Sequence, residues 1–169
     1  ILIYNDFQCT ECNESVLIRL AEKFPEDVRL VYRHFPQADR YDKAYPAAQA
    51  AEAAGRQGKF WEMHDLLFEK QAEWVNQSPD EFKDWVAGEA KELGIDRTQF
   101  EKDMEDPIIF ARIQKAEADA RGAGIPVLPL ILINGEIYIG PTDTNSFEQI
   151  VRLWALSKRQ YRTCPEMTI

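Results

Sequence analysis

Apolar and polar positions along the chain predict strands near its two ends and helices between them. Residues 1–5 form a short apolar run typical of a buried strand, and residues 28–33 form a second one. Between these runs, apolar side chains recur at helical spacing in a helix that we expect to begin at Cys9 and to end at Pro25. A strand, a helix and a strand in this order favour parallel pairing of the two strands with a right-handed crossover.

The middle of the chain, residues 43–121, has the periodicity of helices. Its clearest helix start combines Ser78 as N-cap, Pro79 at the first helical position and Glu81, which completes a capping box. This pattern predicts a helix that ends near Gly94. Further helices are expected at 44–54, 60–68, 96–104 and 106–120.

The strand pattern returns after Gly124. Residues 130–133 are apolar, and the following Asn134-Gly135 pair is a strong hairpin signal that predicts a partner strand at 137–139. Apolar positions at 147–154 mark a final helix. Without the helical middle, the order of elements is βαβ followed by ββα, which predicts a single sheet with helices on both faces.

The length of 169 residues suits one domain of the α/β class. We predict a βαβ half at 1–36, an all-helical insertion at 43–121 and a ββα half at 124–158. No apolar run in the sequence is long enough to span a bilayer. Because the sequence begins within an apolar strand, we expect a further segment before Ile1, where a signal peptide or a membrane anchor could lie.

The net charge of −9 comes from one segment of the chain. Residues 62–106 contain 14 acidic and 5 basic side chains, whereas the remainder has equal numbers of both signs. This distribution argues against nucleic-acid binding, which needs a basic surface. We interpret the acidic segment as the solvated surface of the helical middle.

Two of the three cysteines, Cys9 and Cys12, lie three residues apart between a predicted strand and a predicted helix. At a helix N-terminus, unpaired N–H groups and the positive end of the helix dipole would stabilise a Cys9 thiolate. Cys12 would lie on the same helical face, where the two sulfurs can form a disulfide or separate into a dithiol. We expect Cys9 to be the exposed attacking thiol and Cys12 to be the partly buried resolving thiol.

A structural disulfide or half of a zinc site is the alternative interpretation of this cysteine pair. Zinc usually needs a second pair of ligands at similar spacing, and Cys164, His34 and His64 do not form such a pair. We therefore expect no metal at this site. The position between a strand and a helix favours a redox pair.

Several motifs in a fixed order carry a resemblance that covers nearly the whole chain. The chain resembles the DsbA-like group of the thioredoxin superfamily. The resemblance implies a thioredoxin fold with a helical insertion, and disulfide exchange without a bound cofactor. It also implies reduced or misoxidised protein substrates, an extracytoplasmic location and a membrane quinone-linked partner that reoxidises the pair. The motifs are residues 4–12, 31–36, 50–55, 58–65 and 129–135.

The family places a loop with a cis-proline beside the two cysteines, just before the hairpin, and two prolines compete for this role. Pro129 lies five residues before Asn134, as in the family pattern. If Pro126 took the role, Pro129 would lie inside a central strand, where it could not donate a hydrogen bond. We therefore predict a cis peptide bond between Leu128 and Pro129, in a loop that presents backbone groups to the substrate. The alternative is that both prolines only shape a loop.

The sequence departs from the family pattern at three places. Leu128 stands where relatives usually carry threonine or valine, and we expect it to influence substrate release. Ile3 stands where the family often has a buried carboxylate, so Cys12 would lose its proton through water or to Glu11. The residues between the cysteines are Thr10 and Glu11, and the negative charge of Glu11 opposes a Cys9 thiolate. We therefore predict a less oxidising pair than in a strong oxidase.

Other chemically active side chains have mainly structural interpretations. His34 follows the second predicted strand, and we favour a structural histidine over an accessory residue near the active site. His64 lies on the apolar face of a predicted helix and is expected in the core, as are Trp61 and Trp74. Cys164 is expected to be a free thiol near the C-terminus. An intermolecular disulfide, or a third redox thiol that reaches Cys9, is the alternative.

The sequence leaves the direction of the redox chemistry open. Disulfide formation is favoured by the resemblance, whereas the weak support for a Cys9 thiolate leaves reduction or isomerisation possible. A rival of another class is a metal-binding or copper-handling module on the same fold. A glutathione-conjugating or isomerase-type relative should lack a functional second cysteine, and here Cys12 is present.

Overall fold

The computed structural model describes residues 1–12 and 15–162, so the expectations for Cys164 lie outside the described residues. The described strands form one sheet in the order β2-β1-β3-β4. Their bounds are Leu2–Asn5 for β1, Val31–His34 for β2, Leu130–Ile133 for β3 and Glu136–Ile137 for β4.

Strands β1 and β2 are joined as a parallel pair. The Val31 N–H donates to the Ile1 carbonyl at 2.9 Å, and the Phe35 N–H donates to the Asn5 carbonyl at 2.9 Å. Partners on the two strands therefore keep a constant offset along the chain, as parallel pairing requires. This confirms the pairing expected for the βαβ half.

Strands β3 and β4 form an antiparallel hairpin, with Ile133 opposite Glu136. Asn134 and Gly135 make the turn with φ angles of 52° and 92°, which is the left-handed region that the predicted turn requires. Strand β4 begins at Glu136 and ends at Ile137, so the predicted range of 137–139 was wrong at both ends. Beyond β4, the Tyr138 N–H still donates to the Ile131 carbonyl at 2.9 Å.

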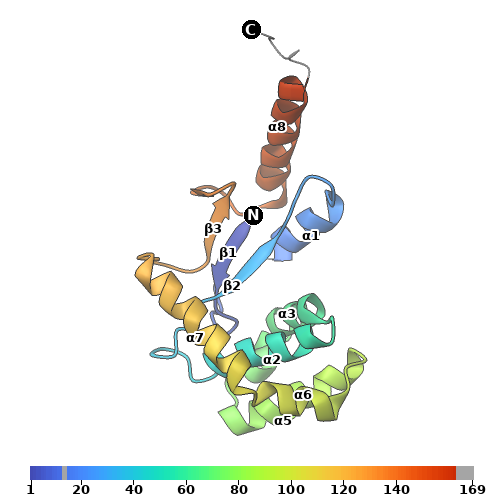
Figure 1. The fold of residues 1–169 in the computed structure, drawn as a ribbon, viewed down its shortest axis with the longest axis vertical. Coiled ribbons are helices and arrows are strands. Elements are labelled where there is room, and N and C mark those ends of the chain that lie inside the picture. The colour runs from blue at the N-terminus through green and yellow to red at the C-terminus, as the bar shows by residue number, and fades with distance from the viewer. Residues whose placement is uncertain (13–14, 163–169) are drawn as a thin grey trace. The chain divides into compact units, whose positions relative to one another are not determined.

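The helical insertion is confirmed between β2 and β3. Helix α2 packs against α3, α5, α6 and α7, which gather around it in Figure 1. Buried alanines of α2, including Ala47, Ala50, Ala51 and Ala54, allow these close approaches because their side chains take little space. The helices of the insertion are α2 Ala44–Arg56, α3 Phe60–Glu69, α4 Gln71–Trp74, α5 Pro79–Glu92, α6 Arg97–Met104 and α7 Pro107–Gly122.

Three helix starts in the insertion are confirmed by their capping contacts. Ser78 accepts a hydrogen bond from the Glu81 N–H, and the Glu81 side chain accepts one from the Ser78 N–H, which completes the capping box. Asp96 and Asp106 accept from N–H groups in the first turns of α6 and α7. Local sequence therefore set the boundaries of these helices correctly.

Two boundaries near the N-terminus were predicted wrongly. Helix α1 spans Ser15–Lys23 and does not begin at Cys9, because the residues after β1 form hydrogen-bonded turns instead. Strand β2 begins at Val31 and not at residue 28, because the Val28 N–H donates back to the Phe24 carbonyl at the end of α1. In both places local hydrogen bonds replace the expected regular element.

The chain divides into two compact units. The first comprises residues 1–2, 14–31 and 131–169, in which α1 packs against α8, Thr144–Arg162. The second comprises residues 3–13 and 32–130 and contains Cys9, Cys12 and Pro129. The groups predicted to carry the chemistry thus belong to one unit.

Candidate active site

Residues 6–12, which we call the redox turn, connect β1 to the segment before α1. Within it, Cys9 and Cys12 form a disulfide, and their Cα atoms are 5.3 Å apart. The Cys9 N–H donates to the Asp6 carbonyl, and the Cys12 N–H donates to the Cys9 carbonyl, both at 3.2 Å. Cys12 is fully buried, whereas Cys9 is half-buried. Cys9 is thus the more accessible of the two cysteines, and its role as the attacking thiol stays a prediction.

Cys9 does not lie at the start of α1, on which the expected stabilisation of its thiolate by the helix dipole depended. The sequence predicted Cys9 at a helix N-terminus, but Ser15 is the first residue of α1. The stabilising effect of a helix dipole is strongest within the first helical turn, and Cys9 lies outside the described helical residues. Thr10 and Glu11 are both exposed beside the disulfide.

Two side-chain amides hold the backbone of the redox turn. Asn5 donates from Nδ2 to the Cys12 carbonyl at 2.8 Å. Gln71, the first residue of α4, donates from Nε2 to the Phe7 carbonyl at 2.7 Å and to the Cys9 carbonyl at 3.1 Å. The carbonyls of both redox cysteines are therefore bound by side chains that the sequence did not single out.

Asp6 is a buried carboxylate within the redox turn. Its Oδ1 accepts from the Gln8 N–H at 2.8 Å, and its Oδ2 accepts from the Gln37 N–H at 2.7 Å. Burial raises the pKa of Asp6 above its ordinary value, and the two N–H donors offset this in part. Asp6 links the redox turn to the segment after β2. An aspartate directly after a buried strand was the available sequence signal for such a turn.

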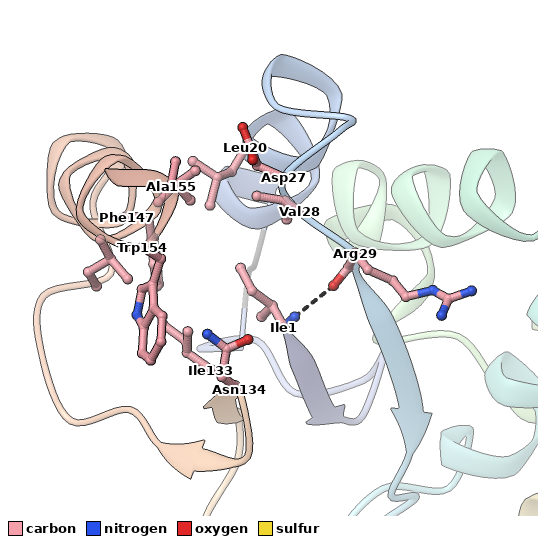
Figure 2. Close-up of a pocket in the computed structure, with 12 residues that line it drawn as sticks. Ile1, Leu20, Asp27, Val28, Arg29, Ile133, Asn134, Phe147, Trp154 and Ala155 are labelled. Carbon is pink, nitrogen blue, oxygen red and sulfur yellow. Dashed lines mark hydrogen bonds between the residues drawn. The ribbon is translucent and has the colours of Figure 1, made fainter. Parts of the chain in front are cut away.

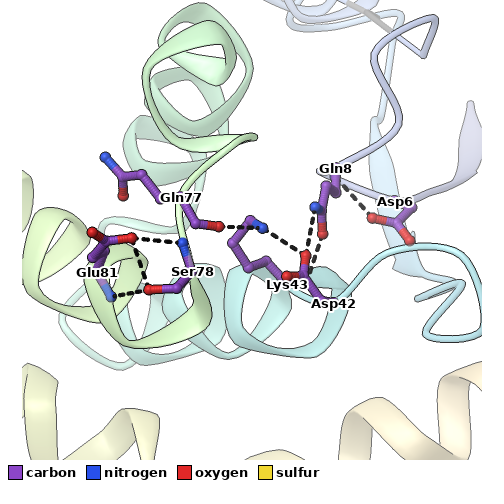
Figure 3. Close-up of polar contacts among 7 residues, drawn as sticks. All are labelled: Asp6, Gln8, Asp42, Lys43, Gln77, Ser78 and Glu81. Atoms are coloured by element: carbon purple, nitrogen blue, oxygen red, sulfur yellow. Dashed lines mark hydrogen bonds and ion pairs between the residues drawn. The ribbon is translucent and has the colours of Figure 1, made fainter.

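Gln8 anchors the redox turn to the helical insertion (Figure 3). Its side chain donates to Asp42 Oδ1 at 2.9 Å and accepts from the Lys43 N–H at 2.7 Å. The Lys43 ammonium, only 2% exposed, donates to Asp42 Oδ1 at 2.6 Å and to the Gln77 carbonyl at 2.8 Å. The buried charge is thereby paired and hydrogen-bonded, as a buried ammonium requires.

Phe7 fixes the redox turn from its buried side. The Phe7 ring stacks on Tyr32 with centroids 5.1 Å apart and also contacts the rings of His34 and His64. His34 Nε2 lies 3.2 Å from Glu52 Oε1, and this hydrogen bond lowers the pKa of Glu52. These buried contacts fit the structural role favoured for His34. His64 is also buried and hydrogen-bonded, as expected for a core histidine.

The Leu128–Pro129 peptide bond is cis, the isomer expected from the sequence. Leu130 follows directly as the first residue of β3, and β3 neighbours β1 in the sheet. The strand that leads into the redox turn therefore lies next to the strand that begins after Pro129. Leu128 is half-buried, and Val127 before it is 61% exposed.

A cavity of about 230 Å³ lies in the first unit (Figure 2). Apolar side chains of α1, β3 and α8 line it, among them Leu20, Ile133, Phe147 and Trp154. The described lining residues include none from the redox turn.

Within residues 1–12 and 15–162, no group of three or more histidine, cysteine and acidic side chains is placed to hold a metal ion. Over the same residues, none of the helices combines the length and the apolar character needed to cross a membrane.

Comparisons with known proteins show the family to which the chain belongs. A model of the thioredoxin family matches residues 1–152, so the chain belongs to that family. A thioredoxin-like oxidoreductase from Silicibacter pomeroyi is 26% identical, with a TM-score of 0.66 over 91% of this chain and 84% of that one. The alpha-DsbA1 structure from Wolbachia pipientis gives a TM-score of 0.73 at 15% identity, over 95% of this chain and 87% of that one.

The fold of this thioredoxin-family chain is similar to that of the DsbA structures, with the helical insertion between its βαβ and ββα halves. Curated relatives of higher identity carry another name. Na(+)/H(+) antiporter NhaA 1 from Mycolicibacterium vanbaalenii is 33% identical over 149 residues, which are 85% of this chain and 23% of that protein. The chain thus spans about a quarter of the length of the curated relatives it matches.

Proposed function

We propose that this chain is a thiol–disulfide oxidoreductase that exchanges disulfides with protein substrates through Cys9 and Cys12. The observation that carries the proposal is the disulfide in the redox turn, with Cys9 partly accessible and Cys12 buried. A structural disulfide would not need this difference, whereas exchange requires one sulfur that a substrate can reach. The DsbA-like fold supports the same chemistry.

Oxidation of a substrate dithiol proceeds in two exchange steps. A substrate thiolate attacks Cys9 Sγ, and the electron pair of the broken disulfide goes to Cys12 Sγ, which takes up a proton. A second substrate thiolate then attacks the substrate sulfur of the mixed disulfide, and Cys9 leaves as a thiolate. The substrate loses two electrons and the Cys9–Cys12 pair gains them. In the reverse direction, the Cys9 thiolate attacks a substrate disulfide and Cys12 resolves the intermediate.

The favoured direction is disulfide formation in extracytoplasmic proteins. Its support is the likeness to DsbA structures, and its cycle needs a membrane quinone-linked partner that reoxidises the dithiol. Reduction or isomerisation is the alternative direction, because Glu11 disfavours the Cys9 thiolate. In either direction, the loop of Leu128 and Pro129 offers backbone groups to an extended substrate, beside the exposed apolar side chain of Val127.

A second candidate function is a redox module joined to a Na⁺/H⁺ antiporter. The specific observation in its favour is the similarity of this chain to about a quarter of several NhaA-named proteins. An antibody against this chain should then detect a membrane-bound native protein of about four times its mass. Detection of the native protein at the mass of the chain alone would reject this candidate.

Cysteine variants test the proposed exchange directly. Cys9→Ser should abolish oxidation of a reduced substrate protein, because no sulfur remains for the substrate to attack. Cys12→Ser should trap a mixed disulfide between Cys9 and the substrate, detectable by mass spectrometry. A wild-type disulfide that does not titrate in glutathione buffers would contradict the proposal. If stoichiometric metal then accompanies the purified protein, the metal-binding alternative is supported instead.

A further inference from the structure

We infer that Gln71 is a positioning residue for the redox pair, whose side-chain amide favours the disulfide over the dithiol by holding the redox turn. The inference rests on the proposed exchange at Cys9 and Cys12 and adds a residue to it. Gln71 comes from the helical insertion, and its side-chain amide donates to the Cys9 carbonyl. Through these contacts, the helical insertion helps to hold the redox turn.

The contacts of Gln71 lie on the backbone of the turn. From one nitrogen, Nε2, its amide donates to the Phe7 carbonyl at 2.7 Å and to the Cys9 carbonyl at 3.1 Å. The Cys9 carbonyl also accepts the Cys12 N–H at 3.2 Å, which closes the turn that brings the two sulfurs together. Gln71 therefore acts on the same turn that the disulfide closes.

The amide of Gln71 is presented by a fixed element. Gln71 begins α4, and Trp74 in the same short helix is fully buried. The Trp74 Nε1–H donates to the Leu67 carbonyl at 2.9 Å, and its ring packs against Phe82 with centroids 5.0 Å apart. Because α4 is tied into the core of the insertion, the amide restrains the redox turn and does not simply follow it.

The amide contacts and the disulfide restrict the same backbone. Each constraint reduces the conformational freedom that the other must remove, so the two constraints stabilise one another. Loss of the amide should therefore weaken the disulfide more than it weakens the dithiol. From the usual strength of such hydrogen bonds, we expect a shift of about three- to tenfold towards the dithiol, or about 15 to 30 mV for this two-electron couple.

The test compares two glutamine variants. Gln71→Met keeps the length of the side chain but removes its donor. Gln57→Met is the matched control, because the Gln57 side chain also binds backbone within the insertion, donating to the Asp96 carbonyl at 3.1 Å and accepting from the Asp96 N–H at 2.9 Å. For each folded protein, the glutathione equilibrium of the pair and the pH at which the Cys9 thiol titrates are measured. If Gln71→Met does not fold, Gln71→Ala takes its place.

We expect Gln71→Met to shift the equilibrium towards the dithiol while the titration of Cys9 stays in place. Gln57→Met should leave both readings at their wild-type values. An unchanged equilibrium, a shift towards the disulfide or an equal shift in Gln57→Met overturns the inference. The inference is also overturned if the shift in the glutathione equilibrium is explained by a change in the pH at which Cys9 titrates. The Gln71 amide would then act on the Cys9 sulfur and not on the backbone of the turn. A wild-type pair that does not titrate at all rejects the proposed function itself.

Discussion

Among the residues of the redox turn, Glu11 carries the charge closest in sequence to both sulfurs. It is exposed, so water screens its effect, but it stands between the two cysteines. Cys9 lies in the turns before α1, outside the first helical turn in which a helix dipole stabilises a thiolate most. We expect both features to disfavour a Cys9 thiolate and so to favour the disulfide form.

Substitution of Glu11 by glutamine should make the pair more oxidising. The variant removes a negative charge beside Cys9, so the thiolate should form at lower pH and the glutathione equilibrium should shift about two- to fivefold towards the dithiol. Glu92→Gln, an exposed glutamate of α5, is the control and should behave as wild type. Equal behaviour of the two variants would show that Glu11 does not tune the pair.

At the scale of elements, a chain of charges connects β2 with two helices of the insertion. Glu52 on α2 lies 3.2 Å from His34 Nε2 on β2 and 3.2 Å from Arg112 Nη1 on α7. The hydrogen bond from His34 is the largest cause of the lowered pKa of Glu52, and the charge of Arg112 adds to it. The negative form of Glu52 is thus favoured in the folded protein.

This lowered pKa predicts how stability depends on pH. A carboxyl whose pKa is depressed on folding stabilises the protein above its ordinary value, here 4.5, and this stabilisation is lost as pH falls through the folded-state pKa. Glu52→Gln should therefore lose less stability than wild type over that acid range, as measured by urea unfolding at a series of pH values. Glu92→Gln again serves as control. A variant that loses stability as steeply as wild type would exclude this role for Glu52.

For the whole molecule, redox state and folding stability are linked. A protein with a strongly oxidising cysteine pair is more stable when the pair is reduced. Because we expect the Cys9 thiolate to be poorly stabilised, we predict that this protein is more stable when the pair is oxidised. The disulfide also restricts the unfolded chain, although its short loop makes that contribution small.

We therefore expect the oxidised protein to unfold at higher urea concentration than the reduced protein. The comparison uses the wild-type protein with its pair oxidised or reduced. A double variant, Cys9→Ser with Cys12→Ser, is the control and should unfold at one concentration under both treatments. Greater stability of the reduced wild-type protein would place the pair among strong oxidants and contradict the argument from Glu11.

The sequence by itself determined the features that depend on neighbouring residues. Capping side chains at Ser78, Asp96 and Asp106 begin their helices because each bonds to N–H groups within the next few residues. Asn134 and Gly135 make the hairpin because they tolerate positive φ. The cysteine pair and the order of the βαβ and ββα halves could also be predicted from the sequence, because both follow from local patterns and family motifs.

Only the tertiary structure decided what surrounds the two sulfurs. Gln71 and Cys9 are 62 residues apart, and Gln8 and Asp42 are 34 apart, so no local pattern signals their contacts. The four-residue helix α4 is too short to show a period, and the burial that raises the pKa of Asp6 depends on packing from distant segments. Local chemistry specified the redox pair, whereas long-range packing placed the groups that hold its turn.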